Sequence, residues 1–222
     1  MSDVPPPPPS QPPYGSVPPG GGSPQVGTAL SYGFNKYFAN VGPVLAVIVV
    51  YFVVQVVFFL IGLSVSSLAG RLLLNVVSFV VSAVVSLGIY KTALMITAGQ
   101  VPTLAEAFTY DRWGEWIVFS IVYGLMVGIG LVLCVIPGLV VLAFFGMAPF
   151  FFIDRGMSLG DALSASREAA SNRGFAWPVL LSIIVGVAGV IACGIGLFVT
   201  APAAYIAVAF LYRNAAGQPV AP

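Results

Sequence analysis

Residues 41–63 read VGPVLAVIVVYFVVQVVFFLIGL and contain no charged side chain. About 20 consecutive apolar residues suffice to cross the hydrocarbon core of a bilayer, so this stretch predicts a transmembrane helix. Further apolar stretches with few charges follow it. We place these additional spans at about 72–92, 116–137, 138–153, 175–193 and 196–212, and the pair Pro137-Gly138 predicts the turn between the third and fourth spans.

The composition indicates the same class of protein. Of 222 residues, 59% are hydrophobic and 7% are charged, and the mean hydropathy is +1.04. Soluble domains carry roughly 25% charged residues. We therefore predict an all-α polytopic protein with six transmembrane helices and the lipid bilayer as its first partner. A net charge of +1 provides no basic field for nucleic acid, which we do not expect as a partner.

The first 25 residues differ sharply from the rest, with prolines in an unbroken run at 5–9 and glycines at 20–22. This composition predicts a disordered or polyproline II tail, and a proline-motif ligand is the alternative. The tail lacks the charged and apolar regions of a secretory signal, so we expect the chain to keep it. The predicted organisation is a tail at 1–25, a transmembrane domain at 26–214 and a short C-terminal tail at 215–222.

Lysine and arginine are distributed unequally between the two ends of the predicted spans. Arg71 stands alone at one end, and the other end holds Lys36, Lys91, Arg112, Arg155, Arg167, Arg173 and Arg213. Because basic loops stay in the cytoplasm, this bias predicts that both termini are cytoplasmic in a bacterial cytoplasmic membrane. Trp113, Trp116 and Trp177 fall at the same boundary, where amphipathic indole rings prefer to lie.

Three segments of similar sequence precede the predicted hairpins: VGTALS at 26–31, LAEAFT at 104–109 and LGDALS at 159–164. The pattern PVLxxIxV also occurs twice, at 43–50 and 178–185. We interpret these similarities as three copies of one unit, an amphipathic interfacial helix followed by a transmembrane hairpin. The units span about 26–100, 101–156 and 157–214.

The helices that open the units have recognisable local chemistry. Thr103 and Ser158 are N-cap candidates, with Glu106 and Asp161 three residues further on, as in a capping box. The first helix carries an apolar stripe at helical spacing, which predicts that it lies in the headgroup boundary. The stripe consists of Val26, Ala29, Leu30, Gly33, Phe34, Tyr37 and Phe38.

Small residues recur at four-residue spacing in the second and third spans. They are Ser78, Ser82, Ser86, Ser120, Gly124 and Gly128. Such faces let membrane helices approach closely, so they predict contacts within one bundle, with self-association or docking on another membrane protein as the alternative. Gln55 is the one polar side chain deep in a span, and we expect it to bond between helices rather than to bind a substrate. Pro149 and Pro202 could kink their spans.

The chain has no histidine, which removes the usual general base and the commonest metal ligand. Its two cysteines, Cys134 and Cys193, are too few for a thiolate zinc site. We expect both as buried thiols, and a disulfide between them is the alternative. We accordingly predict no catalytic, cofactor-binding or metal-binding residue and no cofactor.

The second half of the chain carries Ile136-Pro-Gly, Pro149, the segment SLGDALSASR at 158–167, residues 196–202 and Tyr212-Arg213. In these residues it resembles uncharacterised bacterial integral membrane proteins related to the membrane domain of glycerophosphoryl diester phosphodiesterases. The proline- and glycine-rich tail is similar to that of many actinobacterial members. The resemblance implies a helical membrane fold. It implies no phosphodiesterase activity, because we expect no soluble catalytic domain after Arg213.

Three classes of function remain. The first is a non-enzymatic scaffold or accessory subunit, which fits the small-residue faces and the absence of midplane charge. The second is a carrier or lipid-handling protein, which would require a cavity lined by Gln55 and the serine face of the second span. The third is an enzyme, which would require two of Asp111, Glu115 and Asp154 to converge on a pocket. We expect the first.

Overall fold

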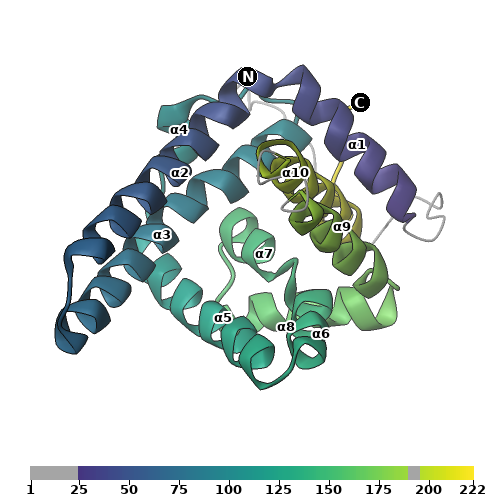
Figure 1. Ribbon diagram of the computed structural model, residues 1–222. Coiled ribbons are helices and arrows are strands. Elements are labelled where there is room, and N and C mark those ends of the chain that lie inside the picture. The colour runs from purple at the N-terminus through teal and green to yellow at the C-terminus, as the bar shows by residue number, and fades with distance from the viewer. Residues whose placement is uncertain (1–24, 190–195) are drawn as a thin grey trace, which may run out of the picture.

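The computed structural model describes residues 25–189 and 196–222, and every regular element within them is an α-helix. The disordered tail predicted for residues 1–25 falls, except for Gln25, outside the described residues. Figure 1 labels the helices. Their bounds are α1 Val26–Ala39, α2 Val41–Ser64, α3 Leu68–Thr97, α4 Leu104–Phe108, α5 Trp113–Leu133, α6 Val135–Phe145, α7 Ala148–Arg155, α8 Leu159–Asn172, α9 Ala176–Ala188 and α10 Leu197–Ala215.

Five segments are long and apolar enough to cross a membrane: α2, α3, α5, the succession of α6 and α7, and α10. A sixth is obtained if α8 and α9 count as one span, although their axes meet at 106°. The predicted fifth span corresponds to α9, whose described part is shorter than the prediction. The chain is therefore an all-α, multi-pass membrane protein with five or six candidate spans, and these helices imply contact with lipid.

The predicted turn at Pro137-Gly138 is wrong. The chain reverses at Cys134, and both residues lie in the first turns of α6. Proline fits there because the first turn of a helix needs few of its own N–H groups. Gly138 does not form a turn but allows close packing, since a side-chain carbon added at Gly130 would lie 3.0 Å from Gly138 Cα. The two glycines let α5 and α6 approach closely.

Two other boundaries also differ from the prediction. The second span is longer than residues 72–92, because the Ser67 hydroxyl accepts a 3.1 Å hydrogen bond from the Gly70 amide and starts α3 early. Lys91 does not end the helix, since its ammonium group reaches the Thr109 carbonyl. The fourth span breaks after Phe145, and Pro149 starts α7 in the position where proline is tolerated. Pro202, in contrast, lies within α10.

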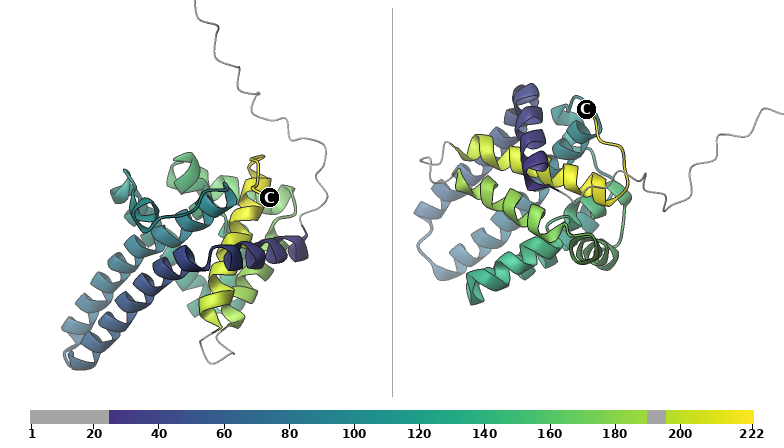
Figure 2. Two further views of the ribbon diagram at one scale, coloured as in Figure 1. Left: turned by 90° about the horizontal axis from the view of Figure 1, so that it is seen from above. Right: turned by 90° about the vertical axis from the view of Figure 1, so that its right-hand side faces the viewer.

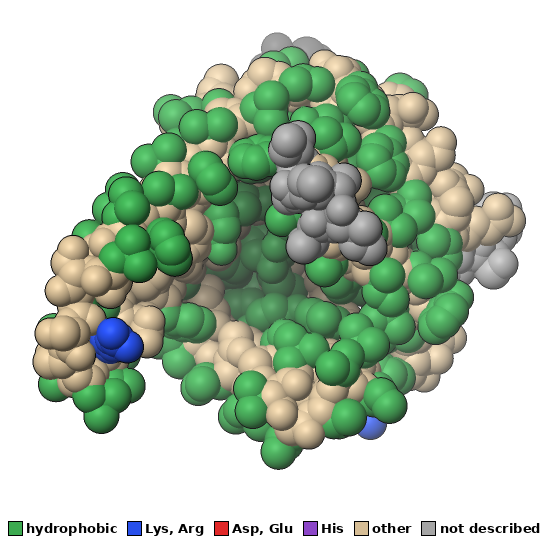
Figure 3. Space-filling model, viewed as in Figure 1, with side chains coloured by type: hydrophobic (Ala, Val, Ile, Leu, Met, Phe, Trp, Pro, Cys, Tyr) green, Lys and Arg blue, Asp and Glu red, His purple; other side chains and the backbone are tan. Residues whose placement is uncertain are grey.

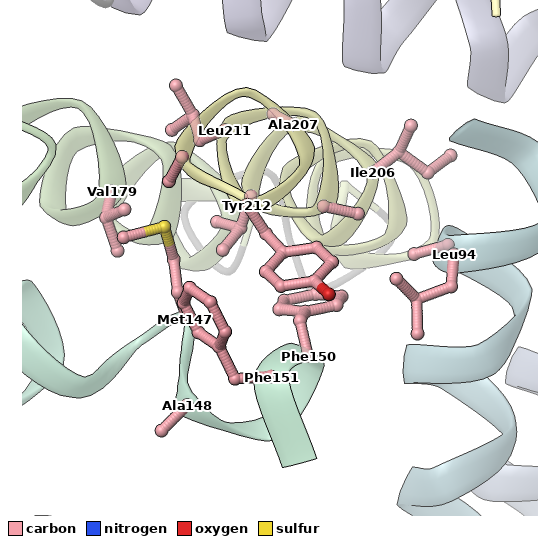
Figure 4. Close-up of a cluster of buried hydrophobic side chains, with 14 of the residues drawn as sticks. Leu94, Met147, Ala148, Phe150, Phe151, Val179, Ile206, Ala207, Leu211 and Tyr212 are labelled. Atoms are coloured by element: carbon pink, nitrogen blue, oxygen red, sulfur yellow. The ribbon is translucent and has the colours of Figure 1, made fainter. Parts of the chain in front are cut away.

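The helices surround a short central element. In Figures 1 and 2, α2 and α3 form a hairpin that extends away from the other helices, whereas α9 and α10 pack side by side and α1 crosses α10. The buried helix α7 lies among them. Figure 4 shows Phe150 and Phe151 beneath Tyr212 of α10, with ring centroids 5.9 and 4.8 Å from that phenol ring. The main core thus lies between α7, α10 and the C-terminal half of α3.

The apolar stripe of α1 predicted that this helix lies in the headgroup boundary. In the structure, protein covers part of the stripe. Ala29, Gly33 and Tyr37 are buried, and the surface that covers Gly33 belongs to α10. Phe38 is 63% exposed and retains the predicted outward position. Apolar periodicity marks the buried side of a helix equally well whether protein or lipid covers it, so the stripe could not distinguish the two.

Gly33→Ala is expected to destabilise the protein by about 1–3 kcal/mol, because the added carbon would overpack the contact between α1 and α10. That carbon would collide with the Ala203 carbonyl oxygen and lie 3.1 Å from Ala207 Cβ. Gly27→Ala, on the same helix with open space around it, is the control and should be neutral or slightly stabilising. Thermal unfolding in detergent measures both. Equal unfolding temperatures would contradict the packing described here.

The predicted helix caps are confirmed. Thr103 accepts from the Glu106 amide while the Glu106 carboxylate accepts from the Thr103 amide, which completes a capping box. The Ser158 hydroxyl accepts a 3.2 Å bond from the Asp161 amide. These carboxylates stabilise the starts of α4 and α8.

The tryptophans placed at the membrane boundary differ in their exposure. Trp177 is 63% exposed, but Trp116 is 1% exposed and its indole N–H donates a 2.7 Å hydrogen bond to the Ala83 carbonyl of α3. Trp116 is therefore covered by protein and is a core residue at the start of α5. A buried indole is tolerated because its N–H has found an acceptor.

Candidate functional site

One face of α3 carries a line of polar side chains along an otherwise apolar helix. Spacings of three or four residues place them on the same side. They are Arg71, Asn75, Ser78, Ser82 and Ser86, and we call this set the polar stripe. Polar groups in a membrane span are costly to keep, so a stripe that runs from the helix start to its middle is a candidate functional feature.

The first half of the stripe lines an open groove between α2 and α3. The groove has a volume of about 580 Å³, which lies within the usual range for small-molecule sites. Its walls are Gln55, Phe58, Phe59, Gly62, Leu63, Arg71, Leu74, Asn75 and Ser78. We call it the outer groove, and it combines a polar side on α3 with aromatic and aliphatic side chains from both helices.

The second half of the stripe lines a cavity of about 170 Å³ between α3, α5 and α7, which we call the inner cavity. Figure 3 shows the molecule hollowed between the α2–α3 hairpin and the other helices, with largely hydrophobic walls. The lining residues are Tyr51, Phe79, Ser82, Ala83, Ser86, Tyr90, Trp116, Phe119, Ser120, Tyr123, Gly124 and Pro149.

Hydroxyl groups make the inner cavity amphipathic. The Ser120 Oγ is buried without a hydrogen-bond partner in the part of the chain described. Such a group costs free energy unless something satisfies it. The Tyr90 ring packs edge-on against Trp116, with centroids 5.7 Å apart, and so forms a rigid wall. An occupant with an apolar body and a few polar atoms would suit this lining.

Gln55 joins the two spaces. Its Nε2 donates a 2.9 Å hydrogen bond from α2 to the Ser82 Oγ of α3, which confirms the prediction of a bond between helices. Gln55 lines the outer groove and Ser82 lines the inner cavity. The polar stripe is thus continuous from one space to the other.

The predicted small-residue faces serve contacts inside the bundle. A carbon added at Gly124 would lie 2.9 Å from the Phe79 ring of α3. Outside the predicted faces, a carbon added at Gly186 of α9 would lie 2.8 Å from Ala204 Cβ of α10. Gly128 is different, because nothing lies within 4 Å of it. Most of the surface that suggested docking on a partner is therefore already covered, while Gly128 leaves a small part of it open.

A second polar cluster gathers around the C-terminal end of α10. Arg173 Nη1 donates to the Ala215 carbonyl at 2.6 Å, and Arg155 Nη2 donates to the Ala216 carbonyl at 2.7 Å. Basic groups near the last carbonyls of a helix satisfy these acceptors and its dipole. The Asp154 carboxylate accepts from the Tyr212 hydroxyl at 2.5 Å and from Gln218 Nε2 at 2.7 Å.

The short C-terminal tail was predicted at 215–222, and its residues after Ala215 are held by this end of the bundle. The Ala221 amide donates to the Thr97 carbonyl at 3.0 Å, and the Tyr32 hydroxyl donates to the Ala221 carbonyl at 3.0 Å. Burial raises the pKa of the Tyr32 phenol, with the positive charge of Arg213 acting in the opposite direction. The phenol therefore keeps the proton that it donates.

The candidate acid–base residues do not line the outer groove or the inner cavity. Glu115 pairs with Arg112, and this hydrogen bond raises the pKa of the guanidinium group. Asp154 is held by Tyr212, whereas Asp111 is exposed. The arrangement that an enzyme would need is not present in these two spaces.

The structure tests the prediction of a buried thiol for Cys134 but not for Cys193. Cys134 is exposed rather than buried, because it occupies the turn between α5 and α6. Cys193 lies outside the described residues, and so does the question of a disulfide between them. Among residues 25–189 and 196–222, no group of three or more Cys, Asp or Glu side chains could hold a metal ion.

Comparison with known proteins gives a distant relationship. The chain is 31% identical over 137 residues to an uncharacterised protein of Mycobacterium bovis and to uncharacterised proteins of Mycobacterium tuberculosis. It is a distant relative of uncharacterised mycobacterial proteins. The match covers 60% of this chain and 42% of each relative, so the chain spans less than half the length of these relatives. No family model matches the sequence, and no solved structure matches it.

Sequence reasoning identified part of the site and missed the rest. The serines and Gln55 were found from their spacing and depth, whereas Arg71 was used only in the charge bias and Asn75 was not predicted as a site residue. A spacing of three as well as four residues towards the N-terminus of α3, which keeps side chains on one helix face, would have included both. The tyrosines of the inner cavity gave no signal, because aromatic residues are common throughout the spans.

Proposed function

We propose that this protein is a non-enzymatic membrane protein that binds an amphiphilic lipid in the outer groove and inner cavity. The observation that carries the proposal is the continuous polar stripe, which links two spaces lined otherwise by apolar side chains. A lipid has matching chemistry, since its head and ester groups need polar partners and its chains need apolar walls. A cavity lined by the serine face was the feature expected of a lipid-handling protein.

A scaffold or accessory role is the second candidate, and Gly128 supports it as an open small-residue position in a span. The other small residues support a scaffold role less than the sequence suggested, since Gly124 and Gly186 already pack against Phe79 and Ala204. We therefore rank lipid binding above it.

We also propose that the chain contains three repeated units and that it has a defined orientation in the membrane. The helices α1, α4 and α8 each precede a pair of apolar segments, which supports three repeated units of interfacial helix and hairpin. The gathering of Lys36, Arg155, Arg173 and Arg213 around residues 215–222 supports a cytoplasmic position for both termini in a bacterial cytoplasmic membrane. Kinship with the phosphodiesterase membrane-domain family belongs to the same proposal and rests on the quoted motifs.

Ser120→Leu tests the lipid site. The larger side chain would fill the inner cavity and displace an occupant, and a loss of about 1.4 kcal/mol of contact lowers binding about tenfold. The unfolding temperature should stay close to that of the wild type, because the adjacent space of about 170 Å³ can accept the larger side chain. Lipid retained through purification in mild detergent is measured by mass spectrometry. Ser164→Leu, at an exposed position on α8, is the control and should keep its lipid.

Equal retention of lipid by both variants would show that the inner cavity is not the binding site. A lipid-free protein that co-purifies with a stoichiometric membrane partner would instead favour the scaffold role.

A further inference from the structure

Arg71 has no acidic partner among the residues that the structure describes. Its guanidinium Nε donates a 2.9 Å hydrogen bond to the Val65 carbonyl, which holds the side chain at the hairpin turn. In the described part of the chain no carboxylate forms an ion pair with Arg71; the salt bridge found there joins Arg112 and Glu115. The two terminal nitrogens of the Arg71 guanidinium are thus available, and their fork geometry suits a phosphate or carboxylate.

The surroundings of Arg71 also favour a phosphate or carboxylate group. Arg71 lies in the first turn of α3, where the helix dipole adds partial positive charge. The exposed Asn75 follows one turn further along the outer groove and adds an amide that can donate to an oxygen atom. No acidic residue lines the groove. Its open end therefore favours a negatively charged group.

The depth of the polar stripe matches one leaflet of a bilayer. Arg71 and Ser82 are eleven residues apart, which corresponds to about 16 Å along a helix. One leaflet contributes about half of the roughly 30 Å hydrocarbon core. A lipid with its head at Arg71 would therefore bring its chains past Ser78 and Gln55 to the inner cavity near the middle of the membrane.

We propose that the outer groove binds the headgroup of an anionic phospholipid, with the phosphate at Arg71 and Asn75 and an acyl chain directed along the stripe to the inner cavity. This assignment rests on the proposed lipid-binding function and names the class of lipid. The occupant comes from the surrounding leaflet, because the groove opens beside the apolar, lipid-facing surfaces of α2 and α3. Charge complementarity selects the anionic class.

The test uses the full chain in mild detergent with equal amounts of phosphatidylglycerol and phosphatidylcholine, and native mass spectrometry counts the lipids that stay bound. Both lipids carry the phosphate, but phosphatidylcholine also brings a quaternary ammonium group close to the positive charge of Arg71, so the wild type should prefer phosphatidylglycerol about tenfold. Arg71→Gln should abolish the preference, and Arg71→Lys should keep part of it. Arg167→Gln removes an equal charge from the exposed face of α8 and should change nothing.

Asn75→Leu is a second test, because Asn75 has no role in the hairpin turn held by Arg71. This variant should weaken binding of phosphatidylglycerol. An unaltered preference in Arg71→Gln, or equal binding of both lipids by the wild type, would overturn the headgroup assignment but leave the proposed function standing if Ser120→Leu still releases lipid. If the wild type retains neither lipid, both proposals fail.

Discussion

Trp116→Ala is expected to lower the free energy of unfolding by about 3–5 kcal/mol, the usual cost of truncating a large buried aromatic side chain. The indole ring stacks on Phe119 with centroids 5.5 Å apart and contacts Phe152 at 6.0 Å. Its loss would also leave the Ala83 carbonyl without the indole N–H bond. Because Trp116 forms a wall of the inner cavity, the truncation would enlarge a space that packing cannot close.

Trp177→Ala is the matched control, since it removes the same side chain from a position that is 63% exposed. Its expected effect is within about 0.5 kcal/mol, as for other surface changes. Reversible unfolding in mixed micelles, followed by circular dichroism, measures both variants. Similar losses in the two would mean that Trp116 is not the core residue described here.

Arg213→Met is expected to cost about 1.5–3 kcal/mol, the range for a hydrogen bond to a charged group. Arg213 is 9% exposed and holds three parts of the chain together. Its Nε donates to Thr97 Oγ1 at 2.9 Å, its Nη2 to the Leu94 carbonyl at 3.2 Å, and its Nη1 to the Pro219 carbonyl at 3.4 Å. Methionine fills similar space but offers none of these donors.

Limited proteolysis together with the unfolding measurement separates the roles of Arg213. The variant should release residues 216–222, which become cleavable before the bundle unfolds. Arg213→Lys should recover only part of the stability, because an ammonium group cannot reproduce the planar fork. Arg167→Met, on an exposed surface, serves as the control for loss of charge. A wild-type cleavage pattern in Arg213→Met would refute this account.

Apolar length predicted the membrane class and most of the spans, because a bilayer fixes the length that a helix must have. Local chemistry predicted the caps at Thr103 and Ser158, where a side chain meets its own backbone. Both kinds of inference use residues that are close in sequence. The bond from Gln55 to Ser82 was also predicted, since a buried amide in a span needs a partner from another helix.

The sequence could not assign apolar faces to protein or to lipid. Trp116 and the stripe of α1 were both placed at the membrane boundary, yet Trp116 packs against Phe119 and Gly33 lies against α10. Lipid tails and aliphatic side chains are equally apolar, so hydropathy carries no signal for this choice. The outer groove was missed for a related reason, because it depends on how α2 and α3 pair.

The central position of α10 has a consequence for biogenesis. This helix packs against α1, α3, α7 and α9, yet it follows all of them in the chain. During synthesis more than 150 residues emerge between α1 and its partner α10. The bond between Tyr32 and Ala221 spans 189 positions. Non-local contacts of this kind form late. The contacts that α10 makes with the earlier helices therefore form last, after those helices have been synthesised.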